Sequence, residues 1–387
     1  MTSSPELHDT PFRFIDDDRT LAEACSAWRG HDAVALDTEF VRERTFYPAL
    51  GLIQVGTEDD IALVDPLAIE DFQPFVDFLE DPGVTKVLHS SSEDLEVFHH
   101  AFGALPRPLV DTQVAAAMAG IGYSLGYGAL VSELCGVDLP KGETRSNWLA
   151  RPLRGAQKVY AARDVDYLRP AWRELAKRLD DLGRRPWLEE DCGRLLDPNR
   201  FAVDDGAAVR KMGQGRRMGP RDLAVLHSLV LWRERTARER DLARNFVLHK
   251  NALREIAQRK PRNLAALRRI PGIHPRGVDR HGRTILDLVA KAMDLPNDQL
   301  PSRPPRPLDI SPHRSTVDAL RDRLSQRADE LGLAPELLAN RRTIESLVRR
   351  HLGGEAPVLP AALRGWRQGV VGETLVEALG DFLPPPR

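Results

Sequence analysis

The chain has few cysteines and no long apolar run, and each shortage excludes a class of protein. Only Cys25, Cys135 and Cys192 occur in 387 residues, far apart and without metal-binding spacing. This spacing excludes a disulfide framework and fits a reducing compartment. Residues 1–14 lack the basic and apolar regions of a secretory signal, so we expect a cytoplasmic protein. The uncharged stretch 112–132 is rich in Gly, Ala and Tyr, which predicts a buried helix and a loop rather than a membrane span.

Lysine is also scarce, at 8 of 55 basic residues, and the charges are unevenly distributed. Residues 1–150 hold 9 basic and 26 acidic side chains (net −17), whereas 151–387 hold 46 and 31 (net +15). The block 210–295 alone holds 21 basic and 8 acidic side chains, a net of +13. Such a block indicates a polyanionic partner such as nucleic acid, although a charge-laced helical surface has the same composition. No feature indicates an obligate protein partner.

The pattern of apolar runs predicts an α/β domain followed by helical domains. Apolar runs at 33–36, 50–56 and 61–65 predict an antiparallel meander, and 85–89 predicts a further buried strand. Helices are expected at 72–79 and 94–102, and helices should dominate from there to about residue 182. Chain breakers at 196–220 and prolines at 301–307 predict linkers. We therefore expect domains at 1–200, 220–298 and 313–383, joined by linkers at 201–219 and 299–312.

Two acids separated by one residue end the first of these strands. Side chains alternate along a strand, so Asp37 and Glu39 lie on one face and Thr38 on the other. Two carboxylates at the end of a buried strand repel each other, and this arrangement is costly unless a cation lies between them. A strand end with two solvated acids is the alternative, and this stretch alone leaves both open.

Two more acids and a tyrosine stand where the same site can use them. Asp94 opens the helix after the strand that ends at His89, and Tyr160 and Asp164 are one turn apart on a helical stretch. Each has a structural alternative, because Asp94 can cap its helix and Tyr160 can fill the core.

Taken together, these residues match a family pattern. The order Asp37-x-Glu39, then 89–95 with Asp94, then Tyr160-x-x-x-Asp164 resembles the motifs of the tyrosine-bearing branch of the DEDD 3′-to-5′ exonucleases. The stretches 52–55, 111–116, 127–131 and 148–153 are similar to the ribonuclease D family in particular. The resemblance implies a ribonuclease H-like mixed-sheet exonuclease domain followed by two small all-α domains.

The C-terminal half extends the resemblance. Residues 231–238, 251–253 and 267–273 resemble the small helical nucleic-acid-binding domain shared by helicases and ribonuclease D. A weaker similarity at 336–341 and 363–367 implies a second, divergent copy. One position departs from the family, because Asn147 precedes the tryptophan where relatives usually carry an acid.

The resemblance implies a chemistry as well. Two divalent cations, Mg²⁺ or Mn²⁺, would be held by Asp37, Glu39 and Asp164 on one side and by Asp37 and Asp94 on the other. Tyr160 would orient the attacking water. Phe40 would stack on the terminal base, and His89, Arg233 and Arg238 are further candidates for contact with nucleic acid.

The expected function is a metal-dependent 3′-to-5′ exoribonuclease. It would act on RNA with a free 3′ end, such as a transfer RNA precursor, and release nucleoside 5′-monophosphates. The sequence shows no reader of the 2′-hydroxyl group, so a DNA exonuclease with the same site stays open. A non-catalytic RNA-binding protein is a second alternative, against which the complete set of carboxylates argues.

Overall fold

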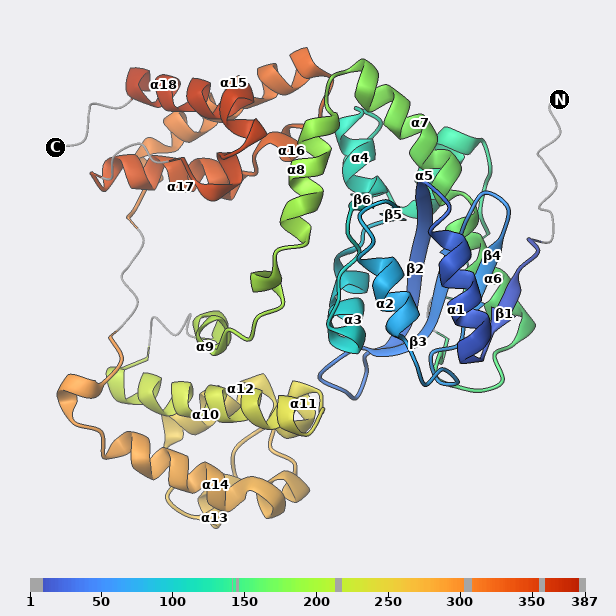
Figure 1. Cartoon of the computed structure of the whole chain (residues 1–387). Helices are drawn as coiled ribbons and strands as arrows, with labels where there is room; N and C mark the ends of the chain where they lie inside the picture. The colour runs from blue at the N-terminus through green and yellow to red at the C-terminus, as the bar shows by residue number, and fades with distance from the viewer. Residues whose placement is uncertain are drawn as a thin grey trace. The chain divides into compact units, whose positions relative to one another are not determined.

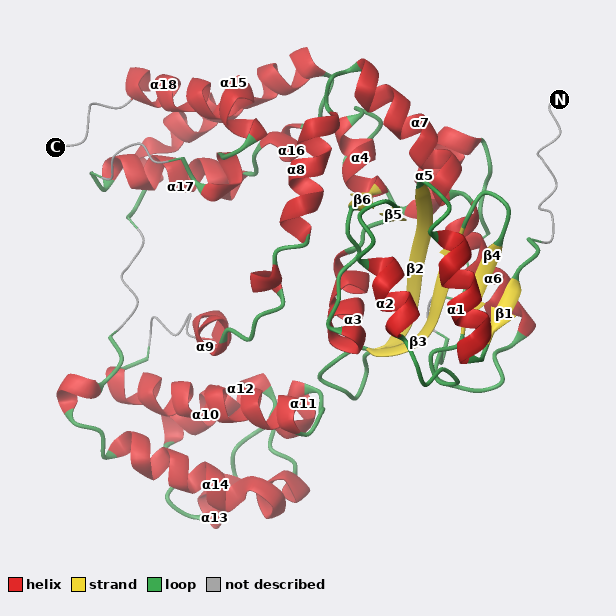
Figure 2. Ribbon diagram, in the orientation of Figure 1, coloured by secondary structure: helices red, strands yellow, loops and turns green. Residues whose placement is uncertain are grey.

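The computed structural model describes residues 10–140, 142–143, 146–212, 218–302, 308–354 and 359–382. These residues form two compact units. One takes in residues 1–40, 50–200 and 307–387, and the other takes in 41–49 and 201–306. Figure 1 labels the elements, and Figure 2 shows that strands occur in the first unit and that the described part of the second is helical.

A six-stranded mixed sheet in the order β1-β4-β3-β2-β5-β6 organises the first unit. Its strands are Arg13–Ile15, Ala33–Val41, Ala49–Gly56, Ile61–Val64, Thr85–Leu88 and Leu109–Asp111, numbered in chain order. The pair β3/β4 is antiparallel, whereas β1/β4, β2/β5 and β5/β6 are parallel. The predicted adjacency of β2, β3 and β4 is confirmed. Helices dominate from residue 102 to about 182 as expected, although β6, with three residues too short to show a strand period, precedes α4.

Helices α1 (Asp18–Trp28), α2 (Gln73–Leu79) and α3 (Ser92–Phe102) share an aromatic core. The ring of Trp28 lies 5.3 Å from that of Phe78, and Phe75 lies 6.2 Å from Phe98. Each such side chain contributes about 1.5 to 3 kcal/mol when fully buried. Packing of α3 in this layer fixes the helix that carries Asp94.

The remaining helices of the exonuclease region are α4 (Thr112–Met118), α5 (Tyr127–Cys135), α6 (Gly155–Asp166), α7 (Leu168–Asp181) and α8 (Arg185–Leu195). Helix α6 packs on one face of the sheet, the face to which Ala35 of β2 and Gly56 of β3 point. A Cβ atom added to Gly56 would lie 3.2 Å from the Cβ of Val165 and 3.4 Å from that of Ala35. Because side chains alternate along β2, Asp37 and Glu39 point to the same side as Ala35, toward the layer of α6.

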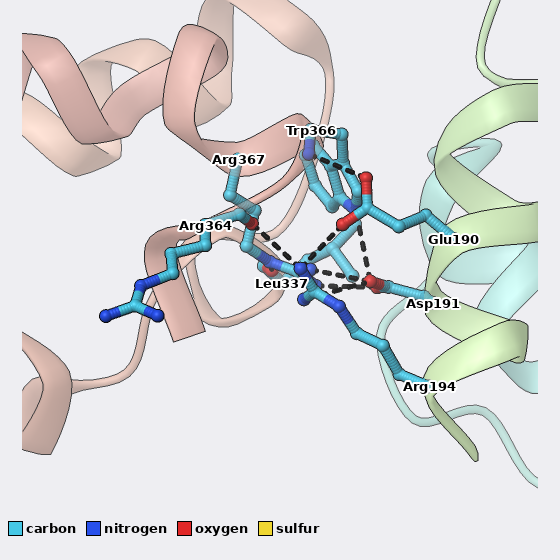
Figure 3. A network of polar contacts seen from close by, with 7 residues as sticks. All are labelled: Glu190, Asp191, Arg194, Leu337, Arg364, Trp366 and Arg367. Atoms are coloured by element: carbon cyan, nitrogen blue, oxygen red, sulfur yellow. Dashed lines mark hydrogen bonds and ion pairs between the residues drawn. The ribbon is translucent and has the colours of Figure 1, made fainter. Parts of the chain in front are cut away.

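The C-terminal helices α15 (Arg314–Leu331), α16 (Pro335–Leu338), α17 (Arg341–Leu352) and α18 (Glu373–Phe382) belong to this unit too. They dock on α8 (Figure 3). The Arg367 guanidinium makes two 2.8 Å bonds to the Asp191 carboxylate, and the Trp366 ring stacks 4.4 Å from that of Trp187. The backbone N–H of Trp366 donates to Glu190 over 2.9 Å. These contacts make the C-terminal helices part of the exonuclease unit.

The second unit consists of α9 (Asp205–Met212), α10 (Pro220–Glu239), α11 (Arg244–Val247), α12 (Lys250–Arg259), α13 (Leu264–Arg268) and α14 (Pro275–Met293) around one apolar core. Helix α9 occupies part of the stretch 201–219, where we expected only a linker, because Ala208, Val209 and Met212 pack on that core. Residues 213–217 and 303–307 of the two expected linkers lie outside the described residues.

The loop 41–49 belongs to this second unit although it follows β2 in the chain. The Asp241 carboxylate accepts from the backbone N–H groups of Phe46 and Tyr47, each over 3.0 Å. The Ala243 N–H donates to the Arg44 carbonyl over 2.9 Å. Over the described ranges, no helix is both long enough and apolar enough to cross a membrane.

Candidate active site

The two acids of β2 lie half-buried at its carboxyl end, with Glu39 two residues beyond Asp37 on the same face. Burial, together with the charges of Asp94, Asp164 and Glu39, raises the pKa of Asp37 well above its usual value. Burial and the charges of Asp164 and Asp94 raise the pKa of Glu39 to about 8. These repulsions mean that all four carboxyl groups lie close enough to act on one another.

Asp94 approaches from α3, on the other side of β2. It lies in the first turn of that helix, is 7% exposed, and accepts a 2.5 Å hydrogen bond from the Thr38 hydroxyl. Burial raises its pKa to about 7, although this bond acts in the opposite direction. Thr38, which lies between Asp37 and Glu39, therefore holds the Asp94 carboxylate. The alternation of side chains along β2 did not predict this contact.

Helix α6 supplies Tyr160 and Asp164. The tyrosine hydroxyl donates to the Asp164 carboxylate; burial raises the pKa of Asp164 to about 7, and this bond partly offsets the increase. Burial and the neighbouring acids raise the pKa of Tyr160 above its usual value, so the hydroxyl keeps its proton. Gly142 packs on the Tyr160 ring so closely that a Cβ atom would overlap it.

The four acids fit a divalent cation. Carboxylate oxygens are the ligands that Mg²⁺ and Mn²⁺ prefer, and a cation would offset the repulsion that adds to burial in raising the pKa values of Asp37 and Glu39. Among the residues that the structure describes, no three acid, histidine or cysteine side chains are already gathered tightly enough to hold one ion. Asp37, Glu39, Asp94 and Asp164 are therefore candidate ligands of the right chemical type, but they do not form a preformed cluster.

Asp111 holds the turn that leads into α3, a role that no pattern in the sequence predicted. Its buried carboxylate accepts from the Ser90 N–H at 3.0 Å, the Ser91 N–H at 2.8 Å and the Ser91 hydroxyl at 2.9 Å. Ser90 has φ +56°, an unusual value for a residue other than glycine. Asp111 also caps α4 through the Gln113 N–H at 2.9 Å. The position of Asp111 directly before α4 predicts a helix cap. The turn at Ser91 that it also holds is 20 residues away in the chain, so no local pattern indicates it.

Three residues expected to contact nucleic acid are engaged within the protein. The ring nitrogens of His89 lie 2.9 Å from the Thr112 hydroxyl and 3.0 Å from the Leu125 carbonyl. Arg233 is 5% exposed and lies 2.8 Å from Glu234, and Arg238 lies 2.8 Å from Asp205. These contacts occupy polar groups of the three side chains within the protein, and their contact with nucleic acid stays a prediction.

Two other positions have clear surroundings. Phe40 is half-buried, directly after Glu39 on β2, so stacking on a base stays a prediction. The side-chain oxygen of Asn147, the position that departs from the family, accepts from the Leu149 N–H over 3.2 Å. This bond closes a local turn before α6.

Comparisons with known proteins agree with this geometry. The 3′-5′ exonuclease family matches residues 12–180, the HRDC domain family matches 222–289, and the C-terminal HRDC domain of ribonuclease D matches 312–375. A mixed sheet that carries such a site and is joined to HRDC domains defines a nuclease of the 3′-5′ exonuclease class, and the expected α/β fold with helical domains is confirmed.

Individual relatives cover nearly the whole chain. It is 43% identical to ribonuclease D of Pseudomonas paraeruginosa strain PA7 over 97% of this chain and 98% of that one. It is 40% identical to ribonuclease D of Escherichia coli strain K12, over 96% and 98%. The crystal structure of Escherichia coli RNase D superimposes with a TM-score of 0.87 at 39% identity, covering 97% of this chain and all of that one. The chain belongs to the ribonuclease D family.

Proposed function

We propose that the chain is a two-metal-ion 3′-to-5′ exoribonuclease that releases nucleoside 5′-monophosphates. The observation that carries this proposal is the convergence of Asp37, Glu39, Asp94 and Asp164: burial, together with the charges of the other acids, raises the pKa values of Asp37 and Glu39. Exonucleases of this family generally depend on divalent ions. Ionising four neighbouring acids is unfavourable by itself, and bound cations would offset that cost.

Each site residue then has a role. Asp37, Glu39 and Asp164 would hold one ion, and Asp37 and Asp94 the other. Ions bound there would supply a nucleophilic hydroxide and positive charge beside the transferring phosphate. Thr38 keeps the Asp94 carboxylate in place through its 2.5 Å bond. Tyr160, whose raised pKa keeps it protonated, orients the water rather than removing its proton.

The proposed substrate is RNA with a free 3′ end, transfer RNA precursors included. The full-length relatives are ribonucleases D, and the Escherichia coli protein is described as an exoribonuclease involved in structured RNA processing. The +13 charge of residues 210–295 supplies a surface that attracts such a polyanion.

One assay separates this function from its alternatives. The protein is incubated with Mg²⁺ and one oligomer made in ribose and in deoxyribose form, and the products are resolved by length and by mass. We expect stepwise shortening of the ribose form from its 3′ end with mononucleotide 5′-phosphates as products, and no cleavage by Asp94→Asn. Faster cleavage of the deoxyribose form would instead indicate a DNA exonuclease, and binding without cleavage a non-catalytic RNA-binding protein.

A further inference from the structure

Strand β3 carries a buried polar side chain that the proposed chemistry does not use. Gln54 is 0% exposed, and neither the nitrogen nor the oxygen of its amide has a hydrogen-bond partner among the residues that the structure describes. Leaving a buried amide unpaired costs about 1 to 3 kcal/mol. Native proteins retain such a group when it has a partner of another kind, such as a water, or a catalytic use.

The strand register places Gln54 beside the site. Strands β2 and β3 are neighbours joined by residues 42–48, a connection too short for a parallel crossover, so they run antiparallel. A Cβ atom on Gly56 would lie 3.4 Å from the Cβ of Ala35, which makes these residues opposite each other on one face. Asp37 comes two residues after Ala35 on β2, and Gln54 comes two residues before Gly56 on β3. Asp37 and Gln54 are therefore opposite each other as well.

The same face is covered by the helix that completes the site. Val165 of α6 lies over Gly56, and α6 carries Tyr160 and Asp164 within the preceding turns. Gln54 is therefore enclosed between the strand and the helix that supply three of the four acids. Its complete burial excludes direct contact with a nucleotide, so its amide can act only through a neighbouring side chain or an enclosed water.

We infer that Gln54 is a positioning residue for Asp37: its amide N–H donates to the Asp37 carboxylate when that carboxylate holds a cation, and its amide oxygen accepts from an enclosed water. Directly opposite residues have Cβ atoms about 4.5 to 5.5 Å apart, so rotation of the Gln54 side chain brings its amide to the carboxylate. This inference rests on Asp37 being a cation ligand, as proposed above.

The test uses Gln54→Met in the full chain, which keeps the length of the side chain and removes its hydrogen-bonding groups. We expect kcat to fall about 10- to 100-fold and the Mn²⁺ concentration at half saturation, measured by calorimetric titration, to rise by a similar factor. KM for RNA should stay unchanged, and the melting temperature of the metal-free protein should hold or rise because its unpaired amide N–H is gone. Trp28→Phe is the matched control, because it removes another buried donor without a partner, on α1 in the aromatic core.

A Gln54→Met protein with unchanged kcat and Mn²⁺ affinity would overturn the inference and leave Gln54 as the holder of a structural water. Should that variant fail to fold, Gln54→Glu, which keeps the shape but loses the donor when ionised, must show the same loss, and wild-type activity there would also overturn it. Asp37→Ala separates this result from the larger proposal. An active Asp37→Ala protein refutes the assignment of the ion ligands, whereas an inactive one beside an unaffected Gln54→Met refutes only the role of Gln54.

Discussion

At the scale of single residues, the site depends on groups that are unfavourable by themselves. Glu39, with a pKa of about 8, and Asp94 and Asp164, with pKa values of about 7, resist the charged state that cation binding requires. Their positions are held by neighbours that carry no ion, such as Thr38 and Asp111. The precision of the site therefore depends on the hydrogen-bond partners of the acids as well as on the acids.

Tyr160→Phe tests the role of the tyrosine hydroxyl. Because the hydroxyl orients water and keeps its proton, we expect kcat to fall by about 10²-fold, the lower end of the range for positioned acid and base groups. Asp94→Asn, which loses an ion ligand, should be more severe. Steady-state cleavage of a short oligomer measures both, and Tyr123→Phe, at a residue that is 51% exposed, is the control. A Tyr160→Phe protein as inactive as Asp94→Asn would show that the tyrosine does more than orient water.

Asp111→Asn tests whether the turn before α3 positions Asp94. The amide cannot accept from both the Ser90 and Ser91 N–H groups, so the turn should relax and move Asp94. We expect kcat to fall about 10- to 100-fold with KM for RNA unchanged, measured well below the melting temperature. Asp17→Asn is matched to it, because Asp17 also caps a helix, accepting from the Thr20 N–H at 2.9 Å, but lies at α1. Equal activity of the two variants would rule out the positioning role.

At the scale of elements, one arginine fixes the entry to α6. The Arg151 guanidinium donates to both oxygens of Asp65, each over 2.6 Å, and to the Gly51 carbonyl over 2.7 Å. Asp65 directly follows β4, and Gly51 lies on β3. The clamp thus joins two strands to the loop before the helix that carries Tyr160 and Asp164.

Arg151→Met should destabilise the protein in a pH-dependent way. Burial would raise the pKa of Asp65, but the bonds from Arg151 outweigh it and lower that pKa. The clamp therefore contributes its full stability above the unfolded pKa of about 3.9 and loses it as the pH falls through the lower folded value. Urea unfolding should show a loss of up to about 3 kcal/mol at pH 7 that shrinks below pH 4. A difference independent of pH would show that packing, and not charge, supplies the stability.

At the scale of the whole molecule, helical regions of related type belong to different units. The helices of 312–375 dock on α8 within the exonuclease unit, whereas those of 222–289 form the core of the second unit. A truncation after residue 197 would therefore remove both the basic unit and the cover of Trp187, which stacks on Trp366. Substitutions are needed to separate RNA binding from structural support.

Gly365→Ala should release the C-terminal helices. Gly365 has φ +70°, and a Cβ atom there would overlap the Glu190 carboxylate of α8. We expect faster amide hydrogen exchange in α15 to α18. Gly136→Ala has a similar backbone angle, φ +68°, but nothing within 4 Å of the added atom, so it carries the strain without the clash. Equal exchange in both proteins would mean that the contact with α8 does not hold these helices.

Replacing Arg254, Arg262 and Arg269 by Gln tests the electrostatic role of the second unit. All three are exposed there. If each contacts one phosphate, the slope of log affinity against log salt should become shallower by about 0.7 per residue for single-stranded RNA. Replacing Arg19, Arg173 and Arg178 by Gln removes the same charge from the exonuclease unit. A slope changed equally by both sets would place the contacts elsewhere or make them unspecific.

Local patterns were enough to predict much of this protein. The alternation in β2 placed Asp37 and Glu39 on one face, and the one-turn spacing on α6 placed Tyr160 with Asp164, because both depend only on the geometry of one element. The run of breakers separated helical regions whose family was then confirmed. The expected helix of Asp94 began two residues early, at Ser92, since local signals define ends poorly.

Tertiary structure alone decided which partners these residues have. Thr38 meets Asp94 across 56 positions and Asp111 meets Ser91 across 20, and Gln54 lies beside Asp37 only through the register of two strands. His89 and Arg238, whose residue types suggest contact with nucleic acid, likewise have protein partners that no local pattern indicated, the Leu125 carbonyl and Asp205. Composition and spacing determine which chemistry is possible, whereas burial and contacts between distant segments determine which side chains are free to perform it.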